Sequence, residues 1–161
     1  MKHLPGDALS DTSCARVRGI NRSDTLAILS ILAESPEASN WSEDSLLESF
    51  LSGTAWVAEP EGRVVGFLIG RAAADEFEIL NMAVALSHRR RGVATQLVKS
   101  ALEWSRTAGI RRAYLEVRAS NASAIALYKR HGFRPCGRRV QYYQNPVEDG
   151  IVLFWNGDEL P

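Results

Sequence analysis

The stretch His88-Arg89-Arg90-Arg91-Gly92-Val93-Ala94 decides how the chain is organised. It follows an apolar, strand-like run over residues 79–84 and opens a helical pattern over residues 93–108. A strand, a basic turn and a helix in this order place unpaired backbone N–H groups at a helix N-terminus. Such a terminus attracts anions, through the first-turn donors and the helix dipole. The stretch is therefore a candidate phosphate site, although by itself a solvated basic turn is the simpler interpretation.

Composition indicates an ordinary globular protein. The chain has 161 residues, of which 45% are hydrophobic and 24% charged, which suits one domain with a sizeable core. Lys+Arg and Asp+Glu both number 19, so the net charge gives no argument for nucleic acid or an anionic membrane. We expect residues 1–14 to form a flexible N-terminal tail and residues 15–161 to form a single domain.

Cysteine and histidine usage favours neither a disulfide framework nor a metal site. Cys14 and Cys136 stand in unlike contexts, and the three histidines are isolated from one another. Reduced thiols fit a cytoplasmic protein. Lys2 is followed by no apolar segment, so we expect no signal peptide, and the longest apolar runs are too short to span a membrane.

Periodicity and turn residues predict the element order β-α-α-β-β-β-α-β-α-β-β. Helices are expected before Pro36, before Gly53, over residues 93–108 and over residues 122–131, and strands over residues 16–20, 54–59, 63–71, 77–86, 112–118, 133–143 and 151–155. The second to fourth strands should form an antiparallel meander. The strands on either side of the third helix should be parallel neighbours, which puts Gly92 at the C-terminal edge of a strand.

Three stretches in this order carry a resemblance to a known family. They are Asn81-Met82-Ala83-Val84, then Arg89-x-x-Gly92-x-Ala94, then Leu115-Glu116-Val117-Arg118-x-Ser120-Asn121 continued by Leu127-Tyr128 and Gly132-Phe133. Together they resemble the Gcn5-related N-acetyltransferase (GNAT) superfamily, and the third resembles its RimI-like branch, the ribosomal-protein-alanine N-acetyltransferases. The resemblance covers about residues 17–154. It implies an α/β (α+β) fold, with a mixed, mostly antiparallel sheet of about seven strands and about four flanking helices.

The same resemblance implies acetyl transfer from acetyl-coenzyme A to an amine. The pantetheine arm would lie along Met82, Ala83 and Val84, with the Val84 N–H holding the oxyanion. The pyrophosphate would sit on the backbone of the turn, where Gly92 has no Cβ and a phosphate can approach closely. Further cofactor contacts are expected from Arg89, Arg90, Arg91, Val93, Ala94, Thr95, Asn121 and Tyr128. Asn121 is in addition a suitable helix N-cap.

Two residues are predicted to transfer protons. An α-amine, with a pKa of about 7.7–8.0, must lose a proton before it attacks, and Glu116 is expected to accept that proton as general base. Glu76 and Glu78 are alternatives for this role, and without the flanking motif Glu116 would be read as an exposed strand residue. Tyr128 is expected to protonate the departing thiolate as general acid, with a core tyrosine as the alternative.

The acceptor groove is assigned to a separate set of residues, and acids near its mouth would suit a basic peptide. The set is Trp41, Glu76, Arg139, Tyr142 and Tyr143. The RimI-like marks imply a protein N-terminal α-amine as acceptor, in particular the N-terminal alanine of a small-subunit ribosomal protein. Two alternatives stay open: an enzyme acting on a small molecule or a lysine, and a non-catalytic coenzyme A-binding module. No metal, nucleic acid or membrane is expected to take part, and we expect a monomer or a weak dimer.

Overall fold

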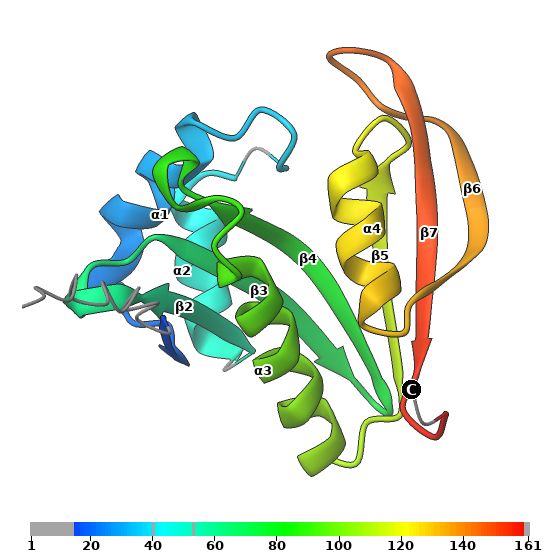
Figure 1. Cartoon of the computed structure of the whole chain (residues 1–161), viewed down its shortest axis with the longest axis horizontal. Helices are drawn as coiled ribbons and strands as arrows, with labels where there is room; N and C mark the ends of the chain where they lie inside the picture. The colour runs from blue at the N-terminus through cyan, green and yellow to red at the C-terminus, as the bar shows by residue number, and fades with distance from the viewer. Residues whose placement is uncertain (1–14, 40, 53, 160–161) are drawn as a thin grey trace, which may run out of the picture.

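A seven-stranded sheet forms the centre of the computed structural model, which describes residues 15–39, 41–52 and 54–159 (Figure 1). The expected tail, residues 1–14, lies outside the described residues. The strand order is β1-β2-β3-β4-β5-β7-β6, and each pair is antiparallel except β4 with β5. The strands are β1 (Arg16–Gly19), β2 (Ala55–Glu59), β3 (Gly66–Ala73), β4 (Glu76–Val84), β5 (Arg112–Arg118), β6 (Arg134–Tyr143) and β7 (Glu148–Asn156).

Four α-helices lie on the two faces of this sheet, with α1 and α2 behind it and α3 and α4 in front in Figure 1. The helices are α1 (Thr25–Ala33), α2 (Glu43–Ser52), α3 (Val93–Thr107) and α4 (Ala122–Arg130), and the short 3-10 helices are η1 (Arg22–Asp24), η2 (Pro60–Gly62) and η3 (Leu86–His88). The predicted element order, the meander and the parallel strand pair are confirmed. Among the described residues, no helix is both long enough and apolar enough to cross a membrane.

Side chains of the central strands contribute to two hydrophobic cores, one on each face of the sheet. In β2, Trp56 and Ala58 join the core beneath α3, while Ala55 and Val57 join the core beneath α1 and α2. Successive side chains of a strand point to opposite faces, so a strand covered on both faces reads as a continuous apolar run. This explains why residues 54–59 show no polar alternation in the sequence.

Polar side chains fix the starts of the helices, as their residue types predict. Asn21 accepts a hydrogen bond from the Ser23 N–H at 3.0 Å, and Asp24 accepts one from the Asn21 N–H at 2.8 Å, which forms a capping box before α1. The Ser42 hydroxyl accepts the Ser45 N–H at 3.2 Å at the start of α2. Asn121 accepts the Ala124 N–H at 3.2 Å, so its predicted role as the N-cap of α4 is confirmed.

Two predicted strand starts lie three residues from the observed ones, and the other strand boundaries agree to within two residues. The return strand was expected from residue 63 but β3 begins at Gly66, because η2 and the segment after it complete the turn first. The last strand was expected from residue 151 but β7 begins at Glu148. The polar residues at its start show no apolar alternation, yet they pair with β6, as Glu148 does with Tyr143.

The strands β4 and β5 pair over only part of their length, and this positions the functional site. Their parallel register runs from Glu76 opposite Arg112 to Ile79 opposite Leu115. Beyond this point the two strands diverge toward their C-terminal ends, as Figure 1 shows. The divergence leaves a gap in the middle of the sheet, next to the turn that leads into α3.

We expect Gly70→Ala to destabilise the fold by about 2 kcal/mol, because a side chain there would overpack the core. Gly70 lies at the register shift between β3 and β4, and an added Cβ would overlap the Phe77 ring and lie 2.9 Å from the Glu78 carbonyl oxygen. Gly19→Ala is the matched control, since an added Cβ there meets nothing within 4 Å. Urea denaturation of the two variants would measure the difference, and equal midpoints would contradict it.

Candidate active site

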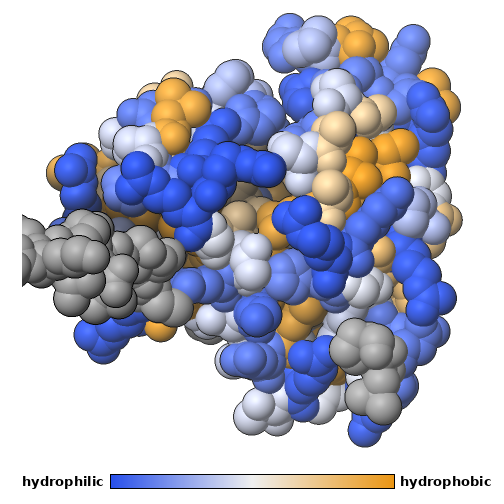
Figure 2. Space-filling view, viewed as in Figure 1, coloured by the Kyte–Doolittle hydropathy of each residue, from blue (hydrophilic) through white to orange (hydrophobic). Residues whose placement is uncertain are grey.

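A groove of two adjoining cavities follows the gap between β4 and β5. The first has a volume of about 350 Å³ and lies between the start of α3 and α4, and the second, of about 70 Å³, lies between the strands themselves. Figure 2 shows the surface hollowed between the two halves of the molecule. Four residues line both cavities and so join them: Glu37, Met82, Asn121 and Ala124.

The turn before α3 presents bare backbone to the first cavity. Gly92 has a φ of 80°, a left-handed conformation that glycine adopts without strain, and an added Cβ would meet nothing within 4 Å. The first hydrogen bond of the helix runs from the Gln96 N–H to the Gly92 carbonyl at 3.1 Å. The N–H groups of residues 93–95 therefore precede the helical ladder, and an anion can accept from them.

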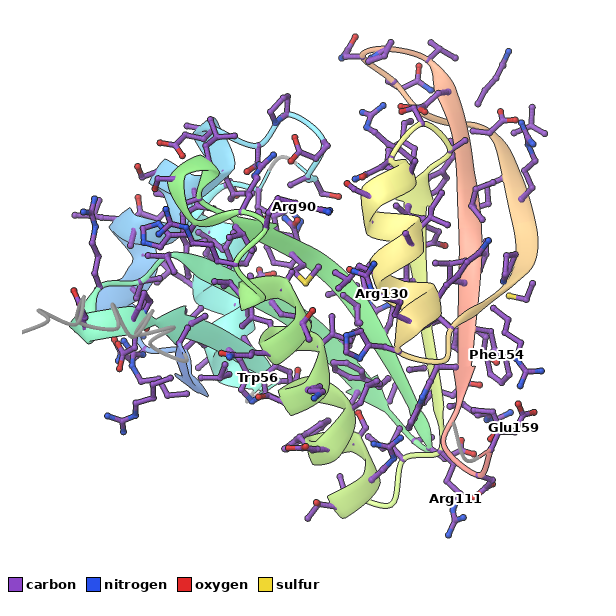
Figure 3. The ribbon with its side chains drawn as sticks, viewed as in Figure 1. Trp56, Arg90, Arg111, Arg130, Phe154 and Glu159 are labelled. Carbon is purple, nitrogen blue, oxygen red and sulfur yellow. The ribbon has the colours of Figure 1, made fainter. Side chains whose placement is uncertain are left out.

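Cationic side chains surround this backbone cradle. Arg90 and Arg130 both line the first cavity, and Figure 3 shows them on its two sides, one from the turn and one from α4. His88 and Arg89 also line it, against a single carboxylate, that of Glu37. The cradle and its positive charge together fit the pyrophosphate of coenzyme A. Arg91 is exposed and does not line either cavity.

The end of β4 forms one wall of the groove through Met82, Ala83 and Val84. The Ala85 N–H donates to the Val65 carbonyl at 2.8 Å on the β3 side. Backbone groups alternate between the two edges of an antiparallel strand, so those of Val84 face the gap toward β5. The Val84 carbonyl accepts the Arg89 Nε–H at 2.9 Å, which agrees with that direction.

The Arg89 guanidinium does not point only at the phosphate cradle. Besides its bond to Val84, it donates to the Ser35 hydroxyl at 2.9 Å and contacts a Glu37 carboxylate oxygen at 2.7 Å. Both partners lie in the segment between α1 and α2. Arg89 therefore lines the first cavity, but its charge is neutralised by a carboxylate of the protein, and its contact with the cofactor stays a prediction.

Glu116 and Tyr128 line the second cavity together, although they come from opposite faces of the sheet. One Glu116 carboxylate oxygen contacts Arg139 Nε at 2.8 Å. The Tyr128 hydroxyl points at the Met82 sulfur, at 4.0 Å, and the ring packs edge-on against Phe133. Burial raises the pKa of Tyr128 far above its ordinary value, so the hydroxyl stays protonated over the whole physiological range.

Tyr143 also lines the second cavity. Burial, Tyr142 and Glu116 raise the pKa of Tyr143 to about 12. The Arg118 guanidinium lies 4.4 Å from the centre of the Tyr143 ring and pairs with Glu148 at 2.8 Å. This pair holds the β6–β7 hairpin against the end of β5. The Arg118 hydrogen bond lowers the pKa of the Glu148 carboxyl, which keeps the pair charged at neutral pH.

The structure leaves some predicted acceptor residues apart from the groove. Glu76 lies at the other end of β4, where it pairs with Arg112 at 3.5 Å, so this placement gives no support to its predicted acceptor contact or to its role as an alternative base. Glu78 is likewise paired with Arg71 on β3. Trp41 packs on the core beneath α1 and α2 and does not line either cavity.

Tyr142 is 47% exposed and lies beneath the Arg139 guanidinium, outside both cavities. Sequence reasoning also missed several lining residues: Glu37, Ser39, Arg118 and Arg130. Arg130 shares a helix face with Leu127, which helical periodicity could have revealed. Glu37 and Ser39 lie in an irregular segment whose sequence carries no periodic signal.

Comparisons with known proteins agree with this fold and site. The family described as Acetyltransferase (GNAT) matches residues 25–133. A Bacillus subtilis (strain 168) protein with the provisional name [ribosomal protein bS18]-alanine N-acetyltransferase is 32% identical over 143 residues, which cover 87% of this chain and 94% of that protein.

Two solved structures share the fold over nearly their whole length. Ard1 from Thermoplasma volcanium superposes with a TM-score of 0.84 at 26% identity and covers 91% of this chain and 99% of its own. The ribosomal-protein-S18-alanine N-acetyltransferase from Escherichia coli superposes with a TM-score of 0.79 at 27% identity. The match covers 91% of this chain and 96% of the Escherichia coli chain.

A divided α/β sheet with a backbone cradle for phosphates defines a coenzyme A-dependent transferase. The chain belongs to the GNAT family of acetyltransferases, because the family match spans more than half of it. It is accordingly an acetyl-coenzyme A-dependent N-acetyltransferase. The resemblance of its sequence motifs to this family is thereby confirmed, and a non-catalytic coenzyme A-binding module is no longer an alternative.

We expect Gly92→Ala to weaken coenzyme A binding at least about tenfold, because a backbone cradle depends on its left-handed residue. Gly109→Ala is the matched control: Gly109 has a φ of 76°, against 80° for Gly92, and open space for a Cβ at both positions. Both variants should lose similar stability, and only Gly92→Ala should lose affinity in calorimetric titration with coenzyme A. A larger loss for Arg90→Gln than for Gly92→Ala would show that side-chain charge dominates instead.

Proposed function

We propose that this enzyme acetylates a protein N-terminal α-amine, with Glu116 as general base and Tyr128 as general acid. The observation that carries the proposal is their meeting in one small cavity where β4 and β5 diverge. One residue offers a carboxylate and the other a protonated phenol, on either side of the Met82 segment along which the pantetheine arm would lie. A direct transfer needs such a pair, because one proton leaves the amine and another reaches the thiolate.

The preferred acceptor is a chain that begins with alanine, in particular a small-subunit ribosomal protein. Relatives named for ribosomal protein bS18 or S18 alanine acetylation support this, since one of them matches over 87% of the chain. The size of the second cavity supports it too. At about 70 Å³ it is much smaller than the first cavity, at about 350 Å³, which favours an acceptor with a small first side chain.

The amine would approach the thioester beside Glu116. Arg139 contacts one carboxylate oxygen of Glu116, so the other oxygen can take the proton, directly or through a water molecule. The Val84 N–H faces the same gap and would polarise the thioester carbonyl and hold the oxyanion of the tetrahedral intermediate. Asn121 caps α4 through its side-chain oxygen, which leaves its amide N–H groups to bind the pantetheine arm.

Tyr128 would complete the reaction as the C–N bond forms and the C–S bond breaks. Its hydroxyl proton passes to the departing coenzyme A sulfur, and the phenolate then regains a proton from solvent or from the cationic nitrogen of the tetrahedral intermediate, which loses it as the amide forms. The Met82 sulfur, 4.0 Å from the hydroxyl, marks a place where this O–H group already faces sulfur. Its raised pKa disfavours loss of the proton at any earlier stage.

A peptide panel tests the acceptor. We expect a peptide that copies a ribosomal-protein N-terminus beginning with alanine to be acetylated at its α-amine. The same peptide beginning with tryptophan should react at least about tenfold more slowly, because the second cavity is the smaller of the two and suits a small first side chain. Mass spectrometry of the products would locate the acetyl group. Acetylated lysine beside an untouched N-terminus would refute the proposal.

Glu116→Gln tests the base. We expect kcat/KM near pH 7 to fall by about 100-fold, and the deficit to shrink above pH about 8, where solvent deprotonates the amine without help. Glu78→Gln is the matched control on the neighbouring strand and should keep its activity. A pH–rate profile of both variants decides the assignment, and full activity of Glu116→Gln at neutral pH would remove Glu116 from the mechanism.

Tyr128→Phe tests the acid. The ring is buried and the hydroxyl contacts the Met82 sulfur at a distance of 4.0 Å, so removing the oxygen costs little packing and we expect the variant to fold normally. Its kcat should fall about 100-fold while the KM for acetyl-coenzyme A changes little, since only the proton donor is lost. Tyr114→Phe, in the Tyr114–Phe154 pair elsewhere on the sheet, provides the control. Unchanged turnover of Tyr128→Phe would mean that the thiolate leaves without an enzyme proton.

A further inference from the structure

Arg89 connects two parts of the groove that are far apart in the chain. It lies three residues before Gly92, in the turn that forms the phosphate cradle. Its guanidinium reaches the segment between α1 and α2, where it contacts Ser35 at 2.9 Å and Glu37 at 2.7 Å. Its Nε–H is at the same time bonded to the Val84 carbonyl at 2.9 Å. One side chain thus joins the cradle, the end of β4 and the segment between α1 and α2.

Residues 34–39 of that segment, here called the crossing loop, are tied to the β4–α3 region at two further points. The buried Asn81 amide donates to the Ser39 carbonyl at 2.9 Å, and the Leu86 N–H donates to the Glu34 carboxylate at 3.3 Å. Asn81 holds the loop from the middle of a strand, which binding of a phosphate does not move. Arg89 differs from Asn81, because its backbone is part of the turn before α3 to which the phosphates would bind.

The crossing loop also forms walls of both cavities. Glu37 lines the first and the second, and Ala38 and Ser39 line the second beside Glu116 and Tyr128. Its position therefore sets the width of the cavity that admits the acceptor amine in the proposed function. The contact between Arg89, in the turn before α3, and Glu37 therefore links the phosphate side of the first cavity to a wall of the second.

We propose that Arg89 is a positioning residue that couples coenzyme binding to the acceptor side of the groove. Coenzyme A fixes the turn at residues 91–95, the fixed turn holds Arg89, and Arg89 holds the crossing loop in the position that completes the second cavity. Two ligands that favour the same arrangement strengthen each other's binding. The acceptor thus binds more tightly to the enzyme that already carries its coenzyme. The acceptor half of this inference rests on the proposed function, whereas the ordering of the loop by coenzyme A does not.

Hydrogen–deuterium exchange on the full chain, with coenzyme A as the probe, tests the ordering. In the natural protein, coenzyme A should slow exchange in residues 91–96 and also in residues 34–39. In Arg89→Gln the first effect should persist and the second should disappear. Glu37→Gln removes the carboxylate that Arg89 contacts and should give the same exchange pattern as Arg89→Gln. The test can therefore still be made if one of the two variants fails to fold. Arg111→Gln, which breaks an arginine–carboxylate pair at the far end of the molecule in Figure 3, should behave like the natural protein.

Kinetics supply a second readout that a purely structural role would not produce. We expect Arg89→Gln to raise the KM for the acceptor about fivefold, while the affinity for coenzyme A alone changes less than about twofold. Loop exchange that coenzyme A slows equally in Arg89→Gln and the natural protein would overturn the proposal. A tenfold loss of coenzyme A affinity in Arg89→Gln would also overturn it, because Arg89 would then be a phosphate ligand. The exchange experiment needs no acceptor, so its outcome is independent of the ribosomal peptide's reactivity.

Discussion

The parting of β4 from β5 is the constraint on which the other features of the site depend. A sheet interior with unpaired backbone groups is costly, since each buried N–H or C=O without a partner loses about 1–3 kcal/mol. Beyond Ile79 and Leu115 the strands leave such groups facing each other across the gap. Arg89 satisfies the Val84 carbonyl from within the protein. The amide groups of a pantetheine arm can form hydrogen bonds with other unpaired backbone groups along the gap. The incomplete sheet therefore favours an extended ligand that carries amides.

The two cavities differ in the charged side chains that line them, although Arg118 lines the second together with Glu116. Arg90 and Arg130 supply positive charge beside the backbone cradle, at the end that suits phosphates. Glu116 lies at the other end, where a cationic amine would arrive. Glu37 stands between them and is balanced by Arg89. In the proposed function, complementary potentials would favour the phosphates at the end that holds Arg90 and Arg130 and the amine at the end that holds Glu116.

Local sequence patterns were sufficient for the architecture, because strand alternation, helix caps and the glycine before α3 act over a few residues. They predicted the parallel strand pair, whereas the assignment of Glu116 and Tyr128 to one site came from the family resemblance. They could not show that Glu76 would lie at the closed end of β4, since that depends on where pairing with β5 stops. They also could not show the contacts of Arg89 with Ser35 and Glu37, which are more than fifty residues away in the chain.

The gap between β4 and β5 is lined from both faces of the sheet: Tyr128 comes from the side of α4, and Ser39 from the segment that follows α1. Residues from both layers of helices therefore line one groove. In the proposed function the coenzyme lies in the first cavity and the acceptor enters the second, so neither has to pass the other. A protein acceptor of the proposed function would need to bring only its first residues into the groove, whatever the size of the rest of the chain.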